Sequence, residues 1–534
     1  MTSTEAAAAR EAEAAKDAAA AERRAAFDRG MLLAWWAERQ PDVPAVVAPT
    51  GVRTFAELNT RANQTVRALR RLGLRDGDGV ALLCRNRPEF VEVLAACQRA
   101  GWRLTPVNWH LTGDEAGYIV DDCEAKALVA EVSLAATAVR ARQQAPACAV
   151  ALAVGGEIDG FVSYDAELAG EASQDIEDPL LGGSMLYTSG TTGRPKGVYR
   201  REVPRPSTVN LFDYRIGADD RHLCTGPLYH AAPLAFSLAL PFSYGVGVVL
   251  MERWDAEAAL SLVEAHQITH THMVPTMFHR LLSLPAEVRD RHDLSSLRSV
   301  VHGAAPCPVP VKQRMIEWLG PVVWEYYAAT EGTGCFVDAT TWLERPGTVG
   351  KPADGQVLVG DAAGEALPVG ETGLVYLKAP PVGRFEYFKD GDKTASTYRG
   401  DYFTLGDVGH MDVDGYLFLT DRSANLIISG GVNVYPAEID AVLLEHPAVG
   451  DAATIGLPDE EWGERVVAVV ELQPGLTGSP ELAAALVDHC RARLARYKCP
   501  QAVEFTAELP RQDNGKIYKR LLRDRYRSSR GGAP

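Results

Sequence analysis

Hydrophobic positions first recur at helical spacing between residues 58 and 72. Apolar residues three or four positions apart lie on one face of a helix, and a glycine after the last of them ends it. The pattern therefore predicts a helix that Gly73 and the following RDGDG turn terminate. Its apolar face would consist of Leu58, Ala62, Val66, Leu69 and Leu72.

Short apolar runs and helical patterns then alternate along the chain. Residues 80–83 are continuously apolar, as expected for a buried strand. Residues 90–99 are predicted to form the next helix, and residues 103–107 the next strand. This repetition predicts βαβ units, and therefore an α/β protein with helices layered on a sheet.

The later part of the chain predicts a β-rich region and then a second α/β region. Residues 345–420 are rich in glycine and contain strand-like runs, which indicates a meander or a small barrel. A helix from residue 437, strands near 452–455 and 466–472, and a helix over 480–494 are expected to follow. The predicted fold class is α/β, with a large N-terminal domain of α/β layers, a barrel-like part and a small C-terminal α/β domain.

Length and composition agree with a globular protein of more than one domain. The chain has 534 residues, of which 46% are hydrophobic and 23% charged. Residues 1–26 are rich in alanine and carry almost no large apolar side chains, so they are expected to be helical or disordered. A helix that binds a partner is the alternative for this extension.

Charge and cysteine usage exclude some classes of partner. The formal net charge is −16, which argues against nucleic acid or an anionic membrane as the main partner. The nine cysteines form no CxxC pair and are expected to be reduced thiols. No apolar run reaches the roughly 20 residues of a membrane helix, so we expect a soluble cytoplasmic protein without membrane insertion.

The densest chemical signal is the stretch Met185 to Val198, MLYTSGTTGRPKGV. Its glycines allow close approach of a ligand to backbone N–H groups, its hydroxyls add donors and its lysine adds a positive charge. Such a loop suits a polyphosphate, although it lacks the Walker spacing; a flexible surface turn is the alternative. The ligand-binding candidates are Thr188, Ser189, Gly190, Thr191, Thr192, Gly193 and Lys196.

This loop resembles the signature loop of the adenylate-forming superfamily, which contains acyl-CoA synthetases, luciferases and peptide-synthetase adenylation domains. Further matches extend the resemblance from about residue 54 to residue 516. It implies an N-terminal extension over 1–26, a large AMP-binding domain over 27–421, and a small mobile domain over 422–534 that carries a catalytic lysine. It also implies ATP and Mg²⁺ as cofactors.

The resemblance assigns nucleotide-binding roles to four later segments. Gly303, Ala304 and Ala305 would border the adenine, on which Tyr327 would stack. The segment Ala328-Ala-Thr-Glu has alanine where the family signature has glycine. Thr330 would hydrogen-bond the α-phosphate, and Glu331 would bind magnesium together with Thr188. Asp407, which follows an interposed Leu405, would bind the ribose, and Arg422 would contact the nucleotide.

Three further positions are implied in catalysis and thiol transfer. Lys516, on an Asn-Gly turn, matches the catalytic lysine, and His230 matches a histidine at the mouth of the acyl pocket. A structural role for His230 stays open. Ser429, Gly430 and Gly431 match the loop that lines the pantetheine channel of CoA, whereas Ala424 and Asn425 depart from the charged residue usual at the hinge.

A local group of histidines invites a metal hypothesis. His266 and His270 are four residues apart and could share a helix face, with His272 and His279 nearby. No carboxylate or cysteine set completes a zinc site. We instead expect the segment around His272 to line the substrate cavity.

The function that these matches imply is ATP-dependent activation of a fatty or aromatic carboxylic acid to an acyl-adenylate, followed by transfer to CoA. One alternative keeps adenylation but uses an amine acceptor, or activates nitrite to diazotise an aryl amine. A third hypothesis is a non-catalytic nucleotide-binding protein. The sequence fixes neither the acid nor the oligomeric state, for which a homodimer is one option.

Overall fold

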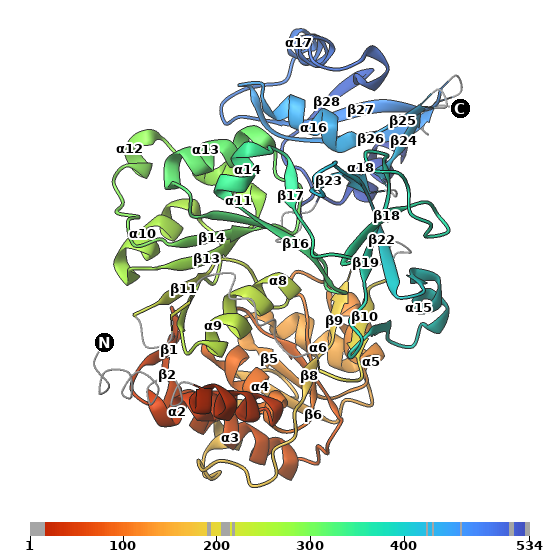
Figure 1. Ribbon diagram of the computed structural model, residues 1–534. Helices are drawn as coiled ribbons and strands as arrows, with labels where there is room; N and C mark the ends of the chain where they lie inside the picture. The colour runs from red at the N-terminus through yellow and green to blue at the C-terminus, as the bar shows by residue number, and fades with distance from the viewer. Residues whose placement is uncertain are drawn as a thin grey trace, which may run out of the picture. The chain divides into compact units, whose positions relative to one another are not determined.

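The computed structural model describes residues 17–188, 194–203, 214–215, 219–422, 425–429, 432–459, 462–511 and 517–528. It divides into two compact units (Figure 1). The first unit contains Met1–His272, Ser295–Leu297 and Pro381–Gly391, and the second contains Met273–Leu294, Arg298–Pro380 and Asp392–Pro534. The division into domains at residues 421 and 422 stays a prediction.

A parallel sheet forms the centre of the first unit. Its six strands have the order β7-β6-β5-β3-β4-β8, and every neighbouring pair is parallel. The strands are β3 (Gly79–Leu83), β4 (Arg103–Pro106), β5 (Ala125–Glu131), β6 (Val150–Val154), β7 (Val162–Ser163) and β8 (Gly183–Ser184). The predicted βαβ repetition is confirmed.

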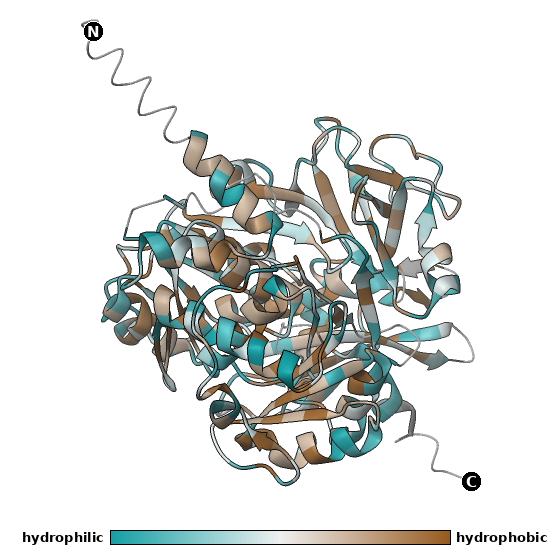
Figure 2. Ribbon diagram, turned by 90° about the horizontal axis from the view of Figure 1, so that it is seen from below, coloured by the Kyte–Doolittle hydropathy of each residue, from teal (hydrophilic) through white to brown (hydrophobic). Residues whose placement is uncertain are grey.

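Both faces of this sheet are covered by helices, which explains its unbroken apolar strands. In β3, Val80 and Leu82 join one hydrophobic core, and Ala81 and Leu83 join the other. The first core includes residues of α3 and α4, and the second includes residues of α5 and α6. These helices are α3 (Phe55–Arg71), α4 (Pro88–Arg99), α5 (Gly113–Asp122) and α6 (Ala135–Gln144). Figure 2 shows brown bands along strands, while many helices carry both brown and teal.

Two further groups of strands belong to the first unit. One has the order β2-β1-β12-β11-β13, in which only the β1–β2 pair is antiparallel. The other is the antiparallel group β20-β10-β9. The strands are β1 (Pro44–Ala48), β2 (Gly51–Thr54), β9 (Leu186–Thr188), β10 (Lys196–Arg200), β11 (Arg221–Cys224), β12 (Gly247–Leu250), β13 (His270–Met273) and β20 (Phe385–Tyr387).

The other helices of the first unit are mostly short. Residues 17–28 are helical, and Glu22 forms an exposed ion pair of 2.7 Å with Arg39; residues 1–16 of the predicted extension lie outside the described residues. The other helices are α2 (Leu32–Arg39), the 3-10 turn η1 (Val132–Leu134), α7 (Tyr164–Leu168), α8 (Ala231–Leu234), the π-helix η2 (Ala235–Ala239), α9 (Leu240–Ser243) and α10 (Ala256–His266).

The second unit begins with strands and helices that lead into an open antiparallel sheet. Strand β14 (Ser299–His302) runs parallel to β15 (Val323–Ala328), which pairs antiparallel with β16 (Thr333–Asp338). The sheet β17-β23-β22-β19-β18, with β21 paired to β22, stands where a barrel-like part was expected; its order does not close. Its strands are β17 (Thr348–Gly350), β18 (Val357–Gly360), β19 (Gly373–Lys378), β21 (Tyr398–Arg399), β22 (Tyr402–Met411) and β23 (Leu417–Arg422).

Five helices accompany these strands. They are α11 (Pro275–Leu282), α12 (Ala286–Arg289), α13 (Val309–Leu319), α14 (Ala339–Glu344) and α15 (Gly391–Thr397).

The last part of the second unit is a small α/β arrangement, as predicted. Its sheet has the order β25-β24-β27-β26, with β28 added in parallel to β27. The strands are β24 (Ile427–Ser429), β25 (Val432–Val434), β26 (Val449–Asp459), β27 (Gly463–Leu472) and β28 (Ala502–Thr506). The helices are α16 (Pro436–Leu444), α17 (Pro480–Arg491), the 3-10 turn η4 (Arg496–Lys498) and α18 (Lys519–Ser528).

Among the described residues, no helix is long and apolar enough to cross a bilayer.

Helix α3 illustrates how local sequence sets an element. Thr54 is its N-cap: the Thr54 hydroxyl accepts a hydrogen bond from the Glu57 N–H, and the Glu57 carboxylate accepts one from the Thr54 N–H. The two donors would otherwise lack partners at the helix start. The opposite end follows Arg70 and Arg71, whose charges suit a helix C-terminus.

We predict that Thr54→Ala lowers the free energy of unfolding by about 1 kcal/mol, because it removes the capping oxygen. Thr54→Ser keeps that oxygen and should remain close to the parent. Urea unfolding followed by fluorescence would measure both variants. Equal midpoints for the alanine and serine variants would contradict the prediction.

Candidate active site

The predicted phosphate loop joins the two strands of a hairpin. Lys196 of β10 lies opposite Thr188 of β9, and Gly197 lies opposite Tyr187. Directly opposed residues of an antiparallel pair place their side chains on the same face. Thr188 and Lys196 are therefore brought together at the mouth of the loop, whereas Ser189, Gly190, Thr191, Thr192 and Gly193 lie outside the described residues.

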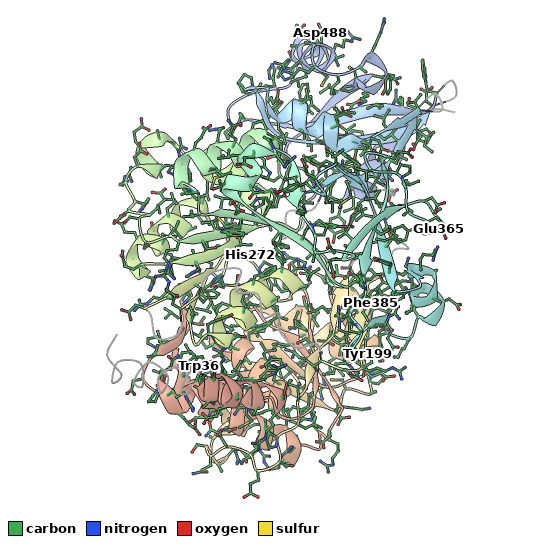
Figure 3. All side chains as sticks on the ribbon, viewed as in Figure 1. Trp36, Tyr199, His272, Glu365, Phe385 and Asp488 are labelled. Atoms are coloured by element: carbon green, nitrogen blue, oxygen red, sulfur yellow. The ribbon has the colours of Figure 1, made fainter. Side chains whose placement is uncertain are left out.

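The ammonium group of Lys196 forms a salt bridge with Asp390. Asp390 follows β20, which pairs with β10 on the side opposite β9. Figure 3 labels Tyr199 on β10, the strand that carries Lys196, and Phe385 on β20, the strand that precedes Asp390. The side chains of Lys196 and Asp390 are 18% and 34% exposed, so solvent reaches both.

The turn that carries Asp390 is bound to residues at the end of helix α5. The Asp390 N–H donates to the Tyr387 carbonyl at 3.0 Å. Lys389 donates to the Asp122 carbonyl at 2.8 Å and forms an ion pair of 3.2 Å with Glu124. These contacts fix the position from which Asp390 reaches the lysine.

Tyr187 ties the other strand of the hairpin to the same place. Its hydroxyl donates to the Asp122 carboxylate at 2.5 Å, and burial raises the pKa of Tyr187 far above its usual range. A side chain at Gly197 would meet the Tyr187 ring at 3.2 Å, so glycine lets the ring lie across the hairpin. These contacts therefore hold the strands at the base of the predicted phosphate loop in place.

A second group of candidate residues lies in the second unit, after strands β14 and β15. A side chain at Gly303 would come within 2.6 Å of the Tyr326 ring and carbonyl, so only glycine fits there. Ala304 has a φ of +68°, which is uncommon for a residue other than glycine. Ala305 follows, so the small residues of this turn lie beside the strand that carries Tyr327.

Tyr327, Asp407 and Arg422 form one hydrogen-bonded chain. The Tyr327 hydroxyl donates to one Asp407 oxygen at 2.8 Å, and the Arg422 guanidinium donates to the other at 2.8 Å. Tyr327 and Asp407 are buried, while the Arg422 side chain is 45% exposed. Attraction to Asp407 raises the pKa of Arg422, and burial raises the pKa of Tyr327 well above 10.

A bulge aims Asp407 at these partners. Leu374 of β19 pairs with Val408 of β22, but Tyr376 pairs with Thr404, so residues 405–407 lie opposite one residue. Within the bulge Gly406 has a φ of +82°, which glycine adopts at little cost.

Thr330 and Glu331 occupy a tight turn directly after β15. The Ala329 N–H donates to the Gly332 carbonyl at 2.7 Å, and the Gly332 N–H donates back to the Ala329 carbonyl at 3.2 Å. Glu331 is buried, and its charge contributes to the raised pKa of Arg422 after Asp407 and Tyr327. The structure thus brings Glu331 near the Tyr327–Asp407–Arg422 chain.

The segment after Arg422 is anchored by Asp421. Its carboxylate accepts hydrogen bonds from the Asn425 side chain at 3.2 Å and from the Ala437 N–H at 3.0 Å. Asn425, a departure from the family pattern, therefore has a structural partner. Ala424 lies outside the described residues.

The candidates for thiol transfer and for catalysis by lysine are only partly described. Ser429 is buried and pairs with Val432 and with Gly463 of β27, but Gly430 and Gly431 lie outside the described residues. Lys516 also lies outside them. The described residues on either side of it, Arg511 and Ile517, form an antiparallel β-bridge.

His230 starts a helical segment in the first unit. It is the N-cap of α8, with its N–H donating to the Pro227 carbonyl and its own carbonyl accepting from the Leu234 N–H, each at 3.1 Å. The His230 ring lies 4.4 Å from the Tyr229 ring, which meets Trp109 edge-on. The π-helix η2 follows α8, and such irregularities are frequent at functional sites.

The histidines suspected of metal binding are distributed over different elements. His266 ends α10, because Gln267 adopts a left-handed conformation there, and His270 belongs to β13; the two do not share a helix. His272 is also in β13, whereas His279 is in α11. In the part of the chain that the structure describes, no group of three histidine, cysteine or acidic residues could hold a metal ion.

The sequence analysis did not identify two acidic residues that bind the strands flanking the predicted phosphate loop. Asp390 lies 194 positions from Lys196, and Asp122 lies 65 positions from Tyr187. The only local signal was a turn of lysine, aspartate and glycine at residues 389–391. Nothing in such a turn indicates its distant partner.

Two family models match this chain. Residues 33–385 match the AMP-binding enzyme family, and residues 438–516 match the AMP-binding enzyme C-terminal domain. The chain therefore belongs to the AMP-binding enzyme family.

Individual relatives match over nearly the full length. A feruloyl-CoA synthase from Amycolatopsis sp is 36% identical over 502 residues, 92% of this chain and 97% of the relative. An anthranilate CoA ligase solved with anthranoyl-AMP is 27% identical with a TM-score of 0.83, covering 94% of this chain and 97% of that one. The amide bond synthetase McbA from Marinactinospora thermotolerans is 28% identical with a TM-score of 0.77, covering 92% and 99%.

Burial of His272 predicts a pH dependence of stability. Burial lowers the pKa of His272 from 6.5 to about 3. Between these values the unfolded chain binds a proton that the folded chain does not, so stability falls as the pH falls. His272 should therefore cost about 2 kcal/mol of stability between pH 7.5 and pH 5.

His272→Gln removes the titrating group and should reduce the loss of stability on acidification by that amount. Urea unfolding at the two pH values would measure it. His110→Gln, at an exposed histidine, is the matched control. An equally steep loss in the His272 variant and the parent would overturn the assignment.

Proposed function

We propose that this protein is an ATP-dependent ligase that activates a carboxylic acid as an acyl-adenylate and transfers the acyl group to CoA. The observation that carries the proposal is the convergence of Tyr327, Asp407, Arg422 and Glu331 from distant segments. In a protein of the AMP-binding enzyme family, these are the residue types that an adenosine phosphate needs: an aromatic ring, a carboxylate for ribose hydroxyls, and a cation.

The first half-reaction needs no general base. A carboxylate oxygen of the acid attacks the α-phosphorus of ATP, the bond to the β-phosphate oxygen breaks, and pyrophosphate leaves. We assign Thr330 to the α-phosphate and Thr188, Lys196 and the loop 189–193 to the departing phosphates. Lys516 is the proposed cation that bridges the acid and the α-phosphate.

Glu331 suits a magnesium ion that is bound mainly through the nucleotide. Mg²⁺ takes oxygen ligands, usually one or two carboxylates with water and phosphate oxygens, and does not need a cage of protein ligands. We assign Glu331 and Thr188 as its protein ligands. When bound, the ion would neutralise charge on the phosphates.

In the second half-reaction, the CoA thiolate attacks the acyl carbon and AMP leaves. We assign Ser429, Gly430 and Gly431 to the pantetheine path, since small residues leave room for a narrow chain. The small domain over residues 422–534 is proposed to move between the two half-reactions. The hydrogen bonds of Asp421 to Asn425 and Ala437 lie where this movement would be controlled.

For the acid, we propose an aromatic carboxylic acid, with a fatty acid as the next candidate. The names of the feruloyl-CoA synthase and the anthranilate ligase indicate aromatic acids for those two proteins. In this chain, His230 is accompanied by Tyr229 and Trp109, and Phe236 stacks on His272 at 5.6 Å. Gly303, Ala304 and Ala305 would border the adenine and the acyl group.

A second candidate function is amide formation. The structural similarity to an amide bond synthetase supports it, because an adenylate can pass its acyl group to an amine as well as to a thiol. The acceptor therefore has to be tested directly.

We predict acid-dependent exchange between pyrophosphate and ATP, and CoA-dependent formation of one thioester for each AMP released. Aromatic and fatty acids would be screened with ATP and Mg²⁺, with CoA, an amine or no acceptor. AMP release that ignores CoA but rises with the amine would favour amide formation. Failure of exchange with every acid would argue for the non-catalytic hypothesis.

Asp407→Asn is predicted to raise KM for ATP on the order of tenfold with little change in kcat, because ribose contacts are present in both ground and transition states. KM for the acid should stay unchanged. Asp414→Asn, which removes an exposed partner of Arg345, is the matched control. Steady-state kinetics with ATP varied would measure both, and an unchanged KM for ATP in the Asp407 variant would refute its role.

A further inference from the structure

We infer that Asp390 is an internal counter-ion that competes with polyphosphate for Lys196. The carboxylate would hold the lysine when the phosphate site is free and would give it up when ATP binds. The inference rests on the proposed function, in which Lys196 contacts the departing phosphates. It adds a residue that the motif around the loop does not contain.

The geometry places the two anions in competition for one ammonium group. Lys196 lies at the end of the phosphate loop, opposite Thr188, and already forms its salt bridge with Asp390. An ammonium has three N–H donors and can contact more than one oxygen. A phosphate that approached from the loop would meet both the lysine and the negative charge of Asp390.

The Asp390 carboxylate is held in place by the contacts of its own turn. Asp390 lies in a turn closed by the bond to Tyr387, and the adjacent Lys389 is bound to Asp122 and Glu124. Lys389 has a φ of +58°, so this turn adopts a left-handed conformation that needs support. These contacts hold Asp390 near the lysine.

Partial exposure makes the exchange of partners feasible. An ion pair that solvent reaches has a modest net strength, because water screens it. Magnesium-bound ATP and pyrophosphate carry several negative charges, and they can displace one carboxylate from Lys196. After pyrophosphate leaves, Asp390 recovers the ammonium, and this return would weaken the rebinding of the product.

The test measures binding, independent of the acid and of the acceptor. Calorimetry would give Kd for magnesium pyrophosphate, MgATP and AMP in the parent and in Asp390→Asn. We expect the variant to bind pyrophosphate and ATP more tightly, on the order of fivefold at low ionic strength, and less so in high salt. AMP lacks the phosphates that reach Lys196, so its Kd should change by less than about twofold.

Two control variants test whether the effect on binding is due to the charge of Asp390 itself. Asp390→Glu retains the charge and should bind the three ligands like the parent. Glu386→Gln removes a charge from the same strand β20, where it pairs with the exposed Arg201, and should have no effect. Pyrophosphate should inhibit turnover more strongly in Asp390→Asn than in either of these.

The outcomes separate the inference from the proposed function. If the parent binds neither MgATP nor pyrophosphate, the proposed function fails. If the parent binds both and Asp390→Asn binds them equally well or more weakly, Asp390 is no competitor, and the inference is overturned while the function stands. A parallel change in AMP binding would also overturn it, because it would show a general effect on the site.

Discussion

The second unit depends on one shared carboxylate. Asp407 has two oxygens, and each accepts a hydrogen bond from a different strand: Tyr327 on β15 and Arg422 on β23. A buried charge is costly unless it is paired and hydrogen-bonded, so the three strands are constrained to keep this arrangement. The turn with Glu331 directly follows β15, and Asp421, beside Arg422, anchors the start of α16. Tyr327 and Arg422 lie near the ends of their strands, and the start of the small α/β part is therefore anchored next to the candidate nucleotide contacts.

In the first unit, the charge that needs a partner is the Lys196 ammonium, and its partner is Asp390. The chain has a formal net charge of −16, and a site for an anion in such a protein needs a local cation. Lys196 supplies it, but an ammonium without a partner in a half-buried position would lose solvation. Asp390 is this partner, and it follows β20, a strand of the distant segment 381–391 that pairs with β10. In each unit, a candidate cation is thus paired with a carboxylate: Lys196 with Asp390 and Arg422 with Asp407.

Sequence periodicity predicted the elements whose stability is local or whose burial is uniform. Helix α3 and strand β3 were found because one has an apolar stripe that ends at a glycine and the other is buried on both faces. The resemblance named Tyr327, Asp407 and Arg422, but it did not state that they bind one another. Asp390 could not be predicted, because its partner lies 194 residues away and no short-range pattern connects them. The expectation that His266 and His270 could share a helix did not hold, because Gln267 ends α10 between them.

Two departures from the family motif, Leu405 and Ala328, lie where the backbone is irregular. Leu405, interposed before Gly406, is absorbed in the bulge that sets residues 405–407 opposite Val375 of β19. Ala328, in place of the motif glycine, lies at the register shift between β15 and β16, where it pairs with Thr333. A bulge accepts extra residues and re-aims the side chains beyond it without disturbing the rest of the sheet. Asp407 lies in the bulge and accepts hydrogen bonds from Tyr327 and Arg422, so the local backbone geometry accommodates Leu405 and still holds Asp407 against both partners.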